Sequence, residues 1–229
     1  MKNVALIVAA GKGTRFGEGE VPKQFLTILD RPLLSWTISR FEQAKSIDHI
    51  VIVTAEEYLL YVNNSIVNPY GFKKVLKIVP GGNQRAESVY KGLQALPLST
   101  PFVAIHDGVR PLVKPDDIDR VMDAAREHRA AVLGRPVTDT LKRVRSDFII
   151  ATVEREGMYR SETPQAFQYD LIREAHEKEA KNGFKATDDA VLVESLGFKV
   201  KMVSATGPNL KVTTPQDLEL AKFYLEMEK

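Results

Sequence analysis

The sequence predicts an α/β fold of three layers, in which helices cover both faces of a mostly parallel, Rossmann-like sheet and a β-hairpin arm projects. Two observations predict the layers: short apolar runs alternate with helical patterns, and 229 residues with 44% hydrophobic content are enough to bury a full core. A third observation predicts the arm, because the alternation breaks between residues 137 and 160. We therefore expect a single domain over residues 1–229 that carries this arm.

Six apolar runs have the length of buried strands, and four segments between them carry apolar residues at helical spacing. The expected strands cover residues 4–9, 50–54, 75–79, 102–105, 130–133 and 199–203. The expected helices cover residues 32–43, 85–96, 115–128 and 169–181. Strands joined through helices run parallel, and such sheets bind their ligands beyond the carboxyl ends of the strands. Residues that follow strands are therefore the first candidates for a site.

The segment 137–160 is expected to be a projecting hairpin. Residues 140–144 and 148–153 would form its two strands, and the chain would turn near Ser146 and Asp147. A two-stranded hairpin cannot bury its own face and is marginally stable alone. We expect this arm to dock on another subunit.

The overall composition excludes several classes of function. The 32 basic and 30 acidic residues nearly cancel, so no cationic field is available to hold a nucleic acid or an anionic membrane. The sequence has no cysteine, which excludes disulfides, thiolate zinc sites and thiol nucleophiles, and fits a reducing compartment. The apolar run at residues 4–10 is too short for a signal peptide or a membrane span. We expect a cytoplasmic protein with neither nucleic acid nor membrane as partner.

The first candidate site follows the first expected strand, at residues 9–15, with the sequence AAGKGTR. Small residues let the backbone approach a ligand, and glycines aim successive N–H groups at an anion. Lys12, Arg15 and the nearby Lys23 would repel one another in an empty loop but complement a triphosphate. A plain tight turn and a dinucleotide fingerprint remain alternatives, although the third glycine of that fingerprint falls on Phe16.

Asp107 is a candidate magnesium ligand because it follows the strand expected at residues 102–105. One carboxylate beside a phosphate-binding loop is enough, since magnesium takes further ligands from phosphate oxygens. A turn-forming aspartate paired with Arg110 is the alternative. His106 is expected to be structural, and the scattered histidines give no zinc spacing.

Two further segments combine glycine or basic residues with polar side chains. Residues 81–88, GGNQRAES, end the third expected strand and open a helix. Their backbone N–H groups and polar side chains could bind a base or a sugar. The alternative is that the segment forms only a capped turn. No helix cap or turn pattern explains the presence of Lys211, which makes it a candidate for ligand binding. In contrast, Asp217 belongs to a helix start after Thr214-Pro215 and is expected to be structural, and Thr187-Asp188 reads first as a helix cap.

Seven segments in this order resemble the cytidylyltransferases that make activated polyol phosphates, most closely the 2-C-methyl-D-erythritol 4-phosphate cytidylyltransferases. The resemblance spans nearly the whole chain, and although each segment alone is a weak signal, seven in register are a strong one. They are AAGKGTR (9–15), PKQ (22–24), GGNQRAES (81–88), His106-Asp107 with Arg110-Pro111, PVTDTLK (136–142), TPQ (163–165) and NLKVT (209–213).

The resemblance implies a single nucleotidyltransferase domain that uses CTP and magnesium to convert 2-C-methyl-D-erythritol 4-phosphate into its cytidylyl derivative. Arg15 and Lys23 would stabilise the transition state, Arg155 and Lys211 would position the acceptor, and Asp107 would hold the metal. The implied substrate-binding residues are Ala9, Ala10, Gly11, Gly82, Asn83, Ser88, Arg110, Thr140 and Thr163. A homodimer is also implied, in which the arm carries Thr140 and Arg155 to the neighbouring site.

The chain departs from the family pattern at two places, with Asn83 where an acid is common and Gly108-Val109 where two alanines are common. Ribitol 5-phosphate cytidylyltransferases share most of the signatures, but residues 139–142 and the compact length favour the methylerythritol substrate. Two functions of other classes remain open from the residues: a nicotinamide-dependent oxidoreductase, because the first loop partly mimics the dinucleotide fingerprint, and a nucleotide-binding regulatory module.

Overall fold

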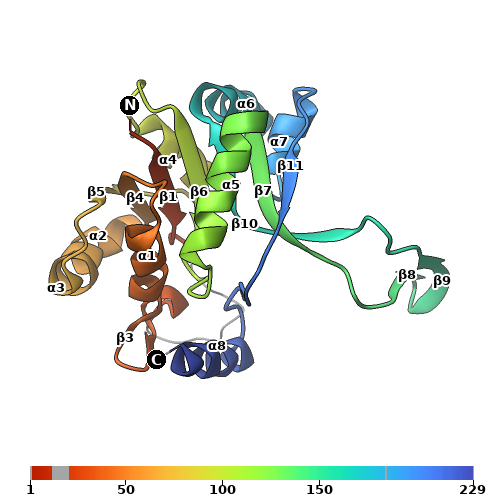
Figure 1. The fold of residues 1–229 in the computed structure, drawn as a ribbon, viewed down its shortest axis with the longest axis horizontal. Coiled ribbons are helices and arrows are strands. Elements are labelled where there is room, and N and C mark those ends of the chain that lie inside the picture. Colours follow the sequence, from red (N-terminus) through yellow and green to blue (C-terminus); the bar gives the residue numbers. More distant parts are fainter. Residues whose placement is uncertain (1, 12–20, 184, 229) are drawn as a thin grey trace.

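The central element of the fold is a mostly parallel sheet, as predicted. The structure, a computed structural model, describes residues 2–11, 21–183 and 185–228. Among these residues, seven strands form the sheet in the order β11-β7-β10-β6-β1-β4-β5 (Figure 1). The strands are β1 (Val4–Val8), β4 (His49–Thr54), β5 (Val75–Pro80), β6 (Phe102–Asp107), β7 (Ala130–Pro136), β10 (Tyr159–Gln168) and β11 (Lys201–Ser204). β10 runs antiparallel to both of its neighbours, while the other neighbouring pairs are parallel.

Helices cover both faces of this sheet. They are α1 (Leu33–Gln43), α2 (Leu59–Tyr61), α3 (Asn68–Tyr70), α4 (Arg85–Gln94), α5 (Pro115–His128), α6 (Tyr169–Asn182), α7 (Ala190–Ser195) and α8 (Pro215–Met227). Shorter elements are η2 (Lys23–Phe25), η3 (Glu56–Tyr58), the π-helical η4 (Val62–Val67) and the two-residue strands β2 (Thr27–Ile28) and β3 (Arg31–Pro32). No helix within the described residues is long and apolar enough to cross a membrane.

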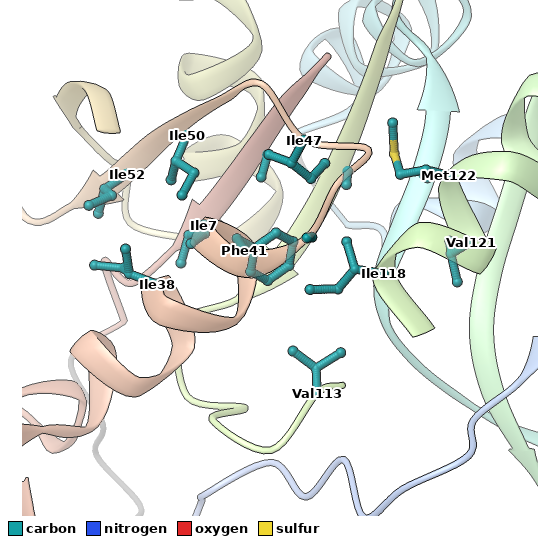
Figure 2. Packing of buried hydrophobic residues seen from close by; sticks show 14 of the residues in the cluster. Ile7, Ile38, Phe41, Ile47, Ile50, Ile52, Val113, Ile118, Val121 and Met122 are labelled. Carbon is teal, nitrogen blue, oxygen red and sulfur yellow. The ribbon is translucent and has the colours of Figure 1, made fainter. Parts of the chain in front are cut away.

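The alternation of side chains along β1 produces two cores. Ala5 and Ile7 join a cluster with α1, α5 and η4, part of which Figure 2 shows around Phe41. Val4 and Leu6 point to the opposite face, where α4, α6 and α7 pack. Because successive strand residues face opposite sides, a strand that is apolar throughout is buried between two helical layers.

A third, smaller cluster lies beneath α8. Leu225 of that helix packs with Trp36, Leu112 and Val212. The helix begins with a capping box between Thr214 and Asp217, which confirms the structural role expected for this aspartate. The cluster ties the segment that carries Lys211 to the rest of the domain.

The hairpin is present where the sequence predicted it. β8 (Leu141–Arg145) pairs antiparallel with β9 (Phe148–Val153). The turn between them places Ser146 and Asp147 at φ angles of 46° and 67°. Figure 1 shows this arm projecting well away from the sheet.

Several elements differ from the expectation. β6 continues through His106 and Asp107, so these residues end the strand and do not follow it. β11 lies slightly later than the predicted strand, and α4 ends at Gln94. The sequence did not reveal β10, nor the helical turns between residues 56 and 70. β10 is the most consequential omission, because it lies in the sheet beside β6.

Candidate active site

A cavity of about 630 Å³ opens beyond the carboxyl ends of β1, β4, β5 and β6. The segments that follow β1, β4 and β5 line it, together with Asp107 at the end of β6. Lys23 and Lys211 contribute from two other parts of the chain. This is the edge at which parallel sheets bind their ligands.

The wall that follows β1 is held by Gln24. This side chain is 2% exposed, and its amide nitrogen donates hydrogen bonds to the carbonyl oxygens of Ala9 (2.8 Å) and Gly11 (3.2 Å). The N–H of Ala9 donates to the carbonyl oxygen of Val53 at 2.7 Å. The small residues Ala9, Ala10 and Gly11 therefore form a fixed backbone surface facing the cavity.

The wall that follows β5 is a tight turn closed by Ser88. Its hydroxyl accepts a hydrogen bond from the N–H of Gly82 and donates one to the carbonyl oxygen of Gln84, both at 3.0 Å. The carboxylate of Glu87 accepts a hydrogen bond from the N–H of Asn83 at 2.7 Å. A Cβ atom at Gly82 would lie 2.1 Å from the end of the Glu87 side chain, so a larger residue there would displace this carboxylate from its hydrogen bond with Asn83. The turn considered from the sequence is thus present and forms part of the cavity, although the side chain of Gln84, at the N-cap of α4, makes no capping hydrogen bond.

Asp107 lies on the cavity floor among three cations. Its Oδ1 is 2.9 Å from Nε of Arg85, and its Oδ2 is 2.9 Å from Nζ of Lys211 and 3.4 Å from Nε of Arg110. Burial acts to raise the pKa of Asp107, but Arg85, Lys211 and Arg110 together hold it far below its usual value. The carboxylate therefore stays ionised. The pairing with Arg110 expected as an alternative exists alongside the two other contacts.

A chain of neutral hydrogen bonds supports Asp107 from behind. Its backbone N–H donates to the hydroxyl oxygen of Thr163 (3.1 Å), and that hydroxyl lies 3.0 Å from Nδ1 of His106. Nε2 of His106 lies 3.2 Å from the carbonyl oxygen of Arg110. Burial lowers the pKa of His106 to about 3, so the ring is neutral, accepts from Thr163 and donates to Arg110. This agrees with the structural role expected for His106.

Arg85 is the residue that sequence reasoning overlooked. It begins α4, lines the cavity and contacts two carboxylates, since its Nη2 also lies 2.9 Å from Oδ2 of Asp189. Burial acts to lower the pKa of Arg85, but Asp189 and Asp107 raise it further above its already high ordinary value. The only available signal was its position at the start of a helix after the glycine turn. The role of Gln24 in fixing Ala9 and Gly11 was likewise not predictable from the segment PKQ alone.

Asp107 is the described side chain best suited to hold a magnesium ion. Among the described residues, no group of three His, Cys, Asp or Glu side chains is placed to hold a metal. Asp107 offers hard carboxylate oxygens on the cavity floor, which suits an ion that takes its other ligands from phosphate and water. Asp107 is therefore the candidate ligand among the described residues, and its oxygens already face cations.

Most of the residues predicted for the site meet in this cavity. Those that line it are Ala9, Ala10, Gly11, Lys23, Gly82, Asn83, Ser88, Asp107 and Lys211. Arg110 and Thr163 are not among the described residues that line it, and both support Asp107 instead. Arg15 and Lys12 lie outside the described residues.

The two arm residues lie apart from this group. Thr140 immediately precedes β8, and Arg155 follows β9, where its guanidinium donates to the carbonyl oxygen of Thr138. Figure 1 shows the arm extending sideways from β7 and β10, away from β1, β4 and β5, whose following segments line the cavity. A single chain therefore does not bring Thr140 and Arg155 to Asp107.

Comparisons with known proteins identify the same family along almost the whole chain. The sequence model described as IspD, 2-C-methyl-D-erythritol 4-phosphate cytidylyltransferase, matches residues 3–227. A relative of that name from Desulforamulus reducens is 44% identical, over 97% of this chain and 95% of its own length. Another from Syntrophotalea carbinolica is 42% identical, over 99% and 97%.

Solved structures agree with the sequence comparison. The 4-diphosphocytidyl-2C-methyl-D-erythritol synthase from Anaerococcus prevotii has a TM-score of 0.85 and 30% identity, covering 98% of this chain and 96% of that one. The 2-C-methyl-D-erythritol 4-phosphate cytidylyltransferase from Thermus thermophilus has a TM-score of 0.79 and 33% identity, covering 99% and 100%. The fold predicted from the sequence is thereby confirmed. The family model and these relatives match nearly the whole length of this chain, which therefore belongs to the 2-C-methyl-D-erythritol 4-phosphate cytidylyltransferase family.

Proposed function

We propose that this chain transfers the cytidylyl group of CTP to 2-C-methyl-D-erythritol 4-phosphate, giving 4-diphosphocytidyl-2-C-methyl-D-erythritol and pyrophosphate for isoprenoid precursor biosynthesis. The observation that carries this proposal is the match to the family over residues 3–227. The cavity supports it, because Lys23, Arg85 and Lys211 line one space suited to a polyanion. The single nucleotidyltransferase domain over residues 1–229 is part of the same proposal.

The reaction joins two anions. An oxygen of the acceptor phosphate attacks the α-phosphorus of CTP in line, a new oxygen–phosphorus bond forms, and the bond to the β-phosphate breaks so that pyrophosphate leaves with both electrons of that bond. The acceptor phosphate is already largely ionised at neutral pH and needs no strong base. Catalysis then consists of holding two mutually repelling groups together and neutralising the charge that develops between them.

The cations divide this work. We infer that Arg15 and Lys23 stabilise the charge that builds at the α-phosphorus, and that Lys211 and Arg155 position the acceptor. Asp107 would offer its carboxylate to Mg²⁺, which when bound neutralises the phosphate oxygens and the departing pyrophosphate. The backbone of residues 9–11 and the turn at Gly82, Asn83 and Ser88 would hold the nucleotide, and Arg110 and Thr163 would contribute to the substrate site by supporting Asp107.

The functional unit is inferred to be a homodimer in which the arm completes the neighbouring site. Within one chain the arm extends away from β1, β4 and β5, which end at the cavity, yet it carries Thr140 and Arg155. Its second strand exposes large apolar side chains, among them Phe148 (76% exposed) and Ile149 (64% exposed). Such side chains in series favour contact with a partner surface. A cytoplasmic location remains a prediction, based on the cysteine-free sequence.

The decisive experiment measures pyrophosphate. Purified protein is incubated with CTP and magnesium, alone and with 2-C-methyl-D-erythritol 4-phosphate or ribitol 5-phosphate. We expect pyrophosphate release that requires the methylerythritol acceptor and is much slower with ribitol phosphate. Release that prefers ribitol phosphate would reassign the acceptor, and absence of release together with tight binding of a nicotinamide cofactor would refute nucleotidyl transfer.

A further inference from the structure

The guanidinium of Arg85 is held between two buried carboxylates, only one of which belongs to the cavity. Its Nε contacts Asp107 on the cavity floor, and its Nη2 contacts Asp189, which is 1% exposed and lies outside the cavity lining. The second contact, at 2.9 Å, is an ion pair rather than a well-aligned hydrogen bond. The two carboxylates fix the orientation of Arg85, while its side chain, 27% exposed, still lines the cavity.

Asp189 is itself held from two further sides. Its Oδ1 is 3.0 Å from Nε2 of His176, a fully buried side chain of α6. Its backbone N–H donates to Oε1 of Gln165 in β10 at 3.0 Å, and that oxygen also accepts from the N–H of Ala190. The start of α7 is thereby fixed to the sheet, and the Asp189 carboxylate is fixed with it.

His176 has only one polar partner among the described residues. Its Nδ1 is buried without a hydrogen bond there, and its other nitrogen contacts Asp189. Burying a ring nitrogen without a partner costs free energy, so a leucine would suit this place better if packing were all that mattered. The histidine is explained if the Asp189 carboxylate needs a donor on the side opposite Arg85.

The charges of the cluster point toward a phosphate. Arg85, Arg110 and Lys211 are three cations against the two carboxylates Asp107 and Asp189, so these five side chains together carry one excess positive charge. Buried ion pairs are weak evidence for stability, because desolvation offsets much of the attraction. Their value here lies in geometry, since two carboxylates fix a planar fork better than one.

We propose that Arg85 is a phosphate-contacting residue of the nucleotide cavity, and that Asp189, supported by His176, is the positioning residue that aims it. This inference rests on the proposed function, since it takes the triphosphate of CTP as the ligand of the cavity. Asp189 does not touch the substrate. It acts through Arg85, whose displacement by about 1 Å is enough to lower the rate about 100-fold.

The test compares Asp189→Asn with Asp117→Asn. Asp117 is equally buried and pairs with Arg120 at 2.8 Å, but neither residue lines the cavity. Both variants remove one buried charge, so both should lower the melting temperature. We expect only Asp189→Asn to reduce kcat/KM for CTP, by about 10- to 100-fold.

Binding measurements distinguish a displaced Arg85 guanidinium from a general structural defect of the cavity. Calorimetry with inorganic triphosphate and magnesium should show about a 10-fold weaker affinity for Asp189→Asn and no change for Asp117→Asn. Binding of cytidine, which has no phosphate, should be the same in both variants and in the native protein. A structural defect of the cavity would weaken cytidine as well, and that result would overturn the inference.

A second pair of variants decides the matter if Asp189→Asn does not fold. His176→Gln keeps an N–H donor near the position of Nε2, whereas His176→Leu keeps the volume and removes the donor. We expect His176→Gln to retain native triphosphate affinity and His176→Leu to lose several-fold. Equal triphosphate affinities for these two variants, or for Asp189→Asn and Asp117→Asn, would overturn the inference.

The two proposals fail differently. If the native protein releases no pyrophosphate from CTP with any acceptor, the proposed function fails. The triphosphate measurements still test Arg85 and Asp189 in that case, because they require no acceptor and no turnover. If the native protein is active and the two aspartate variants are indistinguishable, the inference fails alone.

Discussion

The cavity and the arm hold their charged side chains in opposite ways. In the cavity, Asp107 is buried against three cations, and Thr163 and His106 support it from behind. On the arm, the basic and apolar side chains of β8 and β9 are mostly exposed to solvent. Both regions carry residues predicted for the same reaction.

The difference shows which part of the site one chain completes by itself. Groups held by several partners are preorganised and need no rearrangement when charge develops on a substrate. Exposed groups on a two-stranded hairpin have no such support until another surface covers them. We therefore expect changes in the cavity to act within one chain and changes on the arm to act on its neighbour.

The largest effect is expected in the cavity. Lys23→Ala should lower kcat by about 100- to 1,000-fold while the protein remains folded, because one preorganised cation at the reacting phosphorus is lost. Steady-state pyrophosphate assays measure the rate, and circular dichroism checks the fold. A folded Lys23→Ala variant with native kcat would contradict the placement of this lysine at the reaction.

A complementation experiment tests whether the arm serves the neighbour. Arg155→Ala alone should lower kcat/KM about 10- to 100-fold. When it is co-refolded with Lys23→Ala at equal amounts, half of the dimers are mixed, and each mixed dimer has one intact site if Arg155 crosses over. Activity should recover to about a quarter of the native level by this statistical argument. No recovery, with mixed dimers verified by mass, would place Arg155 in its own chain's site.

A matched pair of isoleucines compares the packing of the two regions. Ile52 is fully buried in β4, whereas Ile149 is 64% exposed on β9. Urea unfolding should show a loss of about 0.5–1.5 kcal/mol for Ile52→Val and less than about 0.5 kcal/mol for Ile149→Val. An equal loss at Ile149 would show that the arm's apolar face is covered in solution.

The smallest effect is expected at α8, away from both regions. Asp217→Ala removes the capping box and should cost about 1 kcal/mol at neutral pH with no change in kcat. Burial acts to raise the pKa of Asp217, but hydrogen bonds from Thr213 and Thr214 hold it below the ordinary value of 3.8. A depressed pKa gives stability above pH 3.8 that is lost as the pH falls through the folded value. The difference between native and variant unfolding free energies should therefore shrink in acid.

Local patterns predicted most of the sheet but not its antiparallel strand. β1 and β4 are uninterrupted apolar runs, and such runs are typical of strands buried on both faces. β10 contains Glu162 and Pro164, and proline normally argues against a strand inside a sheet. Its pairing with β7 shifts register between Ser161 and Gln165, where these residues lie. Contacts with distant residues make that irregular strand possible, and a single sequence does not display them.

The site residues also divide into those that local patterns predict and those that only distant contacts bring together. Residues 9–11 and the turn at Gly82 were predictable because glycine and alanine leave a local signature. The contact of Arg85 with Asp189 depends on α4 and α7 packing on the same face of the sheet, which only the tertiary fold determines. The resemblance to a family placed Lys211 and Asp107 in one site, and the structure brings them to 2.9 Å.

The arm joins the sheet through two residues that face each other. The chain leaves at Pro136 and returns at Tyr159, which are direct partners in the β7–β10 ladder, and the N–H of Val137 bonds to the carbonyl oxygen of Met158 at 2.9 Å. The whole segment between these two residues therefore begins and ends at one cross-strand pair, as the loop of an ordinary hairpin does. Its length can change, or the entire loop can be grafted from a homologue, without shifting the pairing of any strand beneath it.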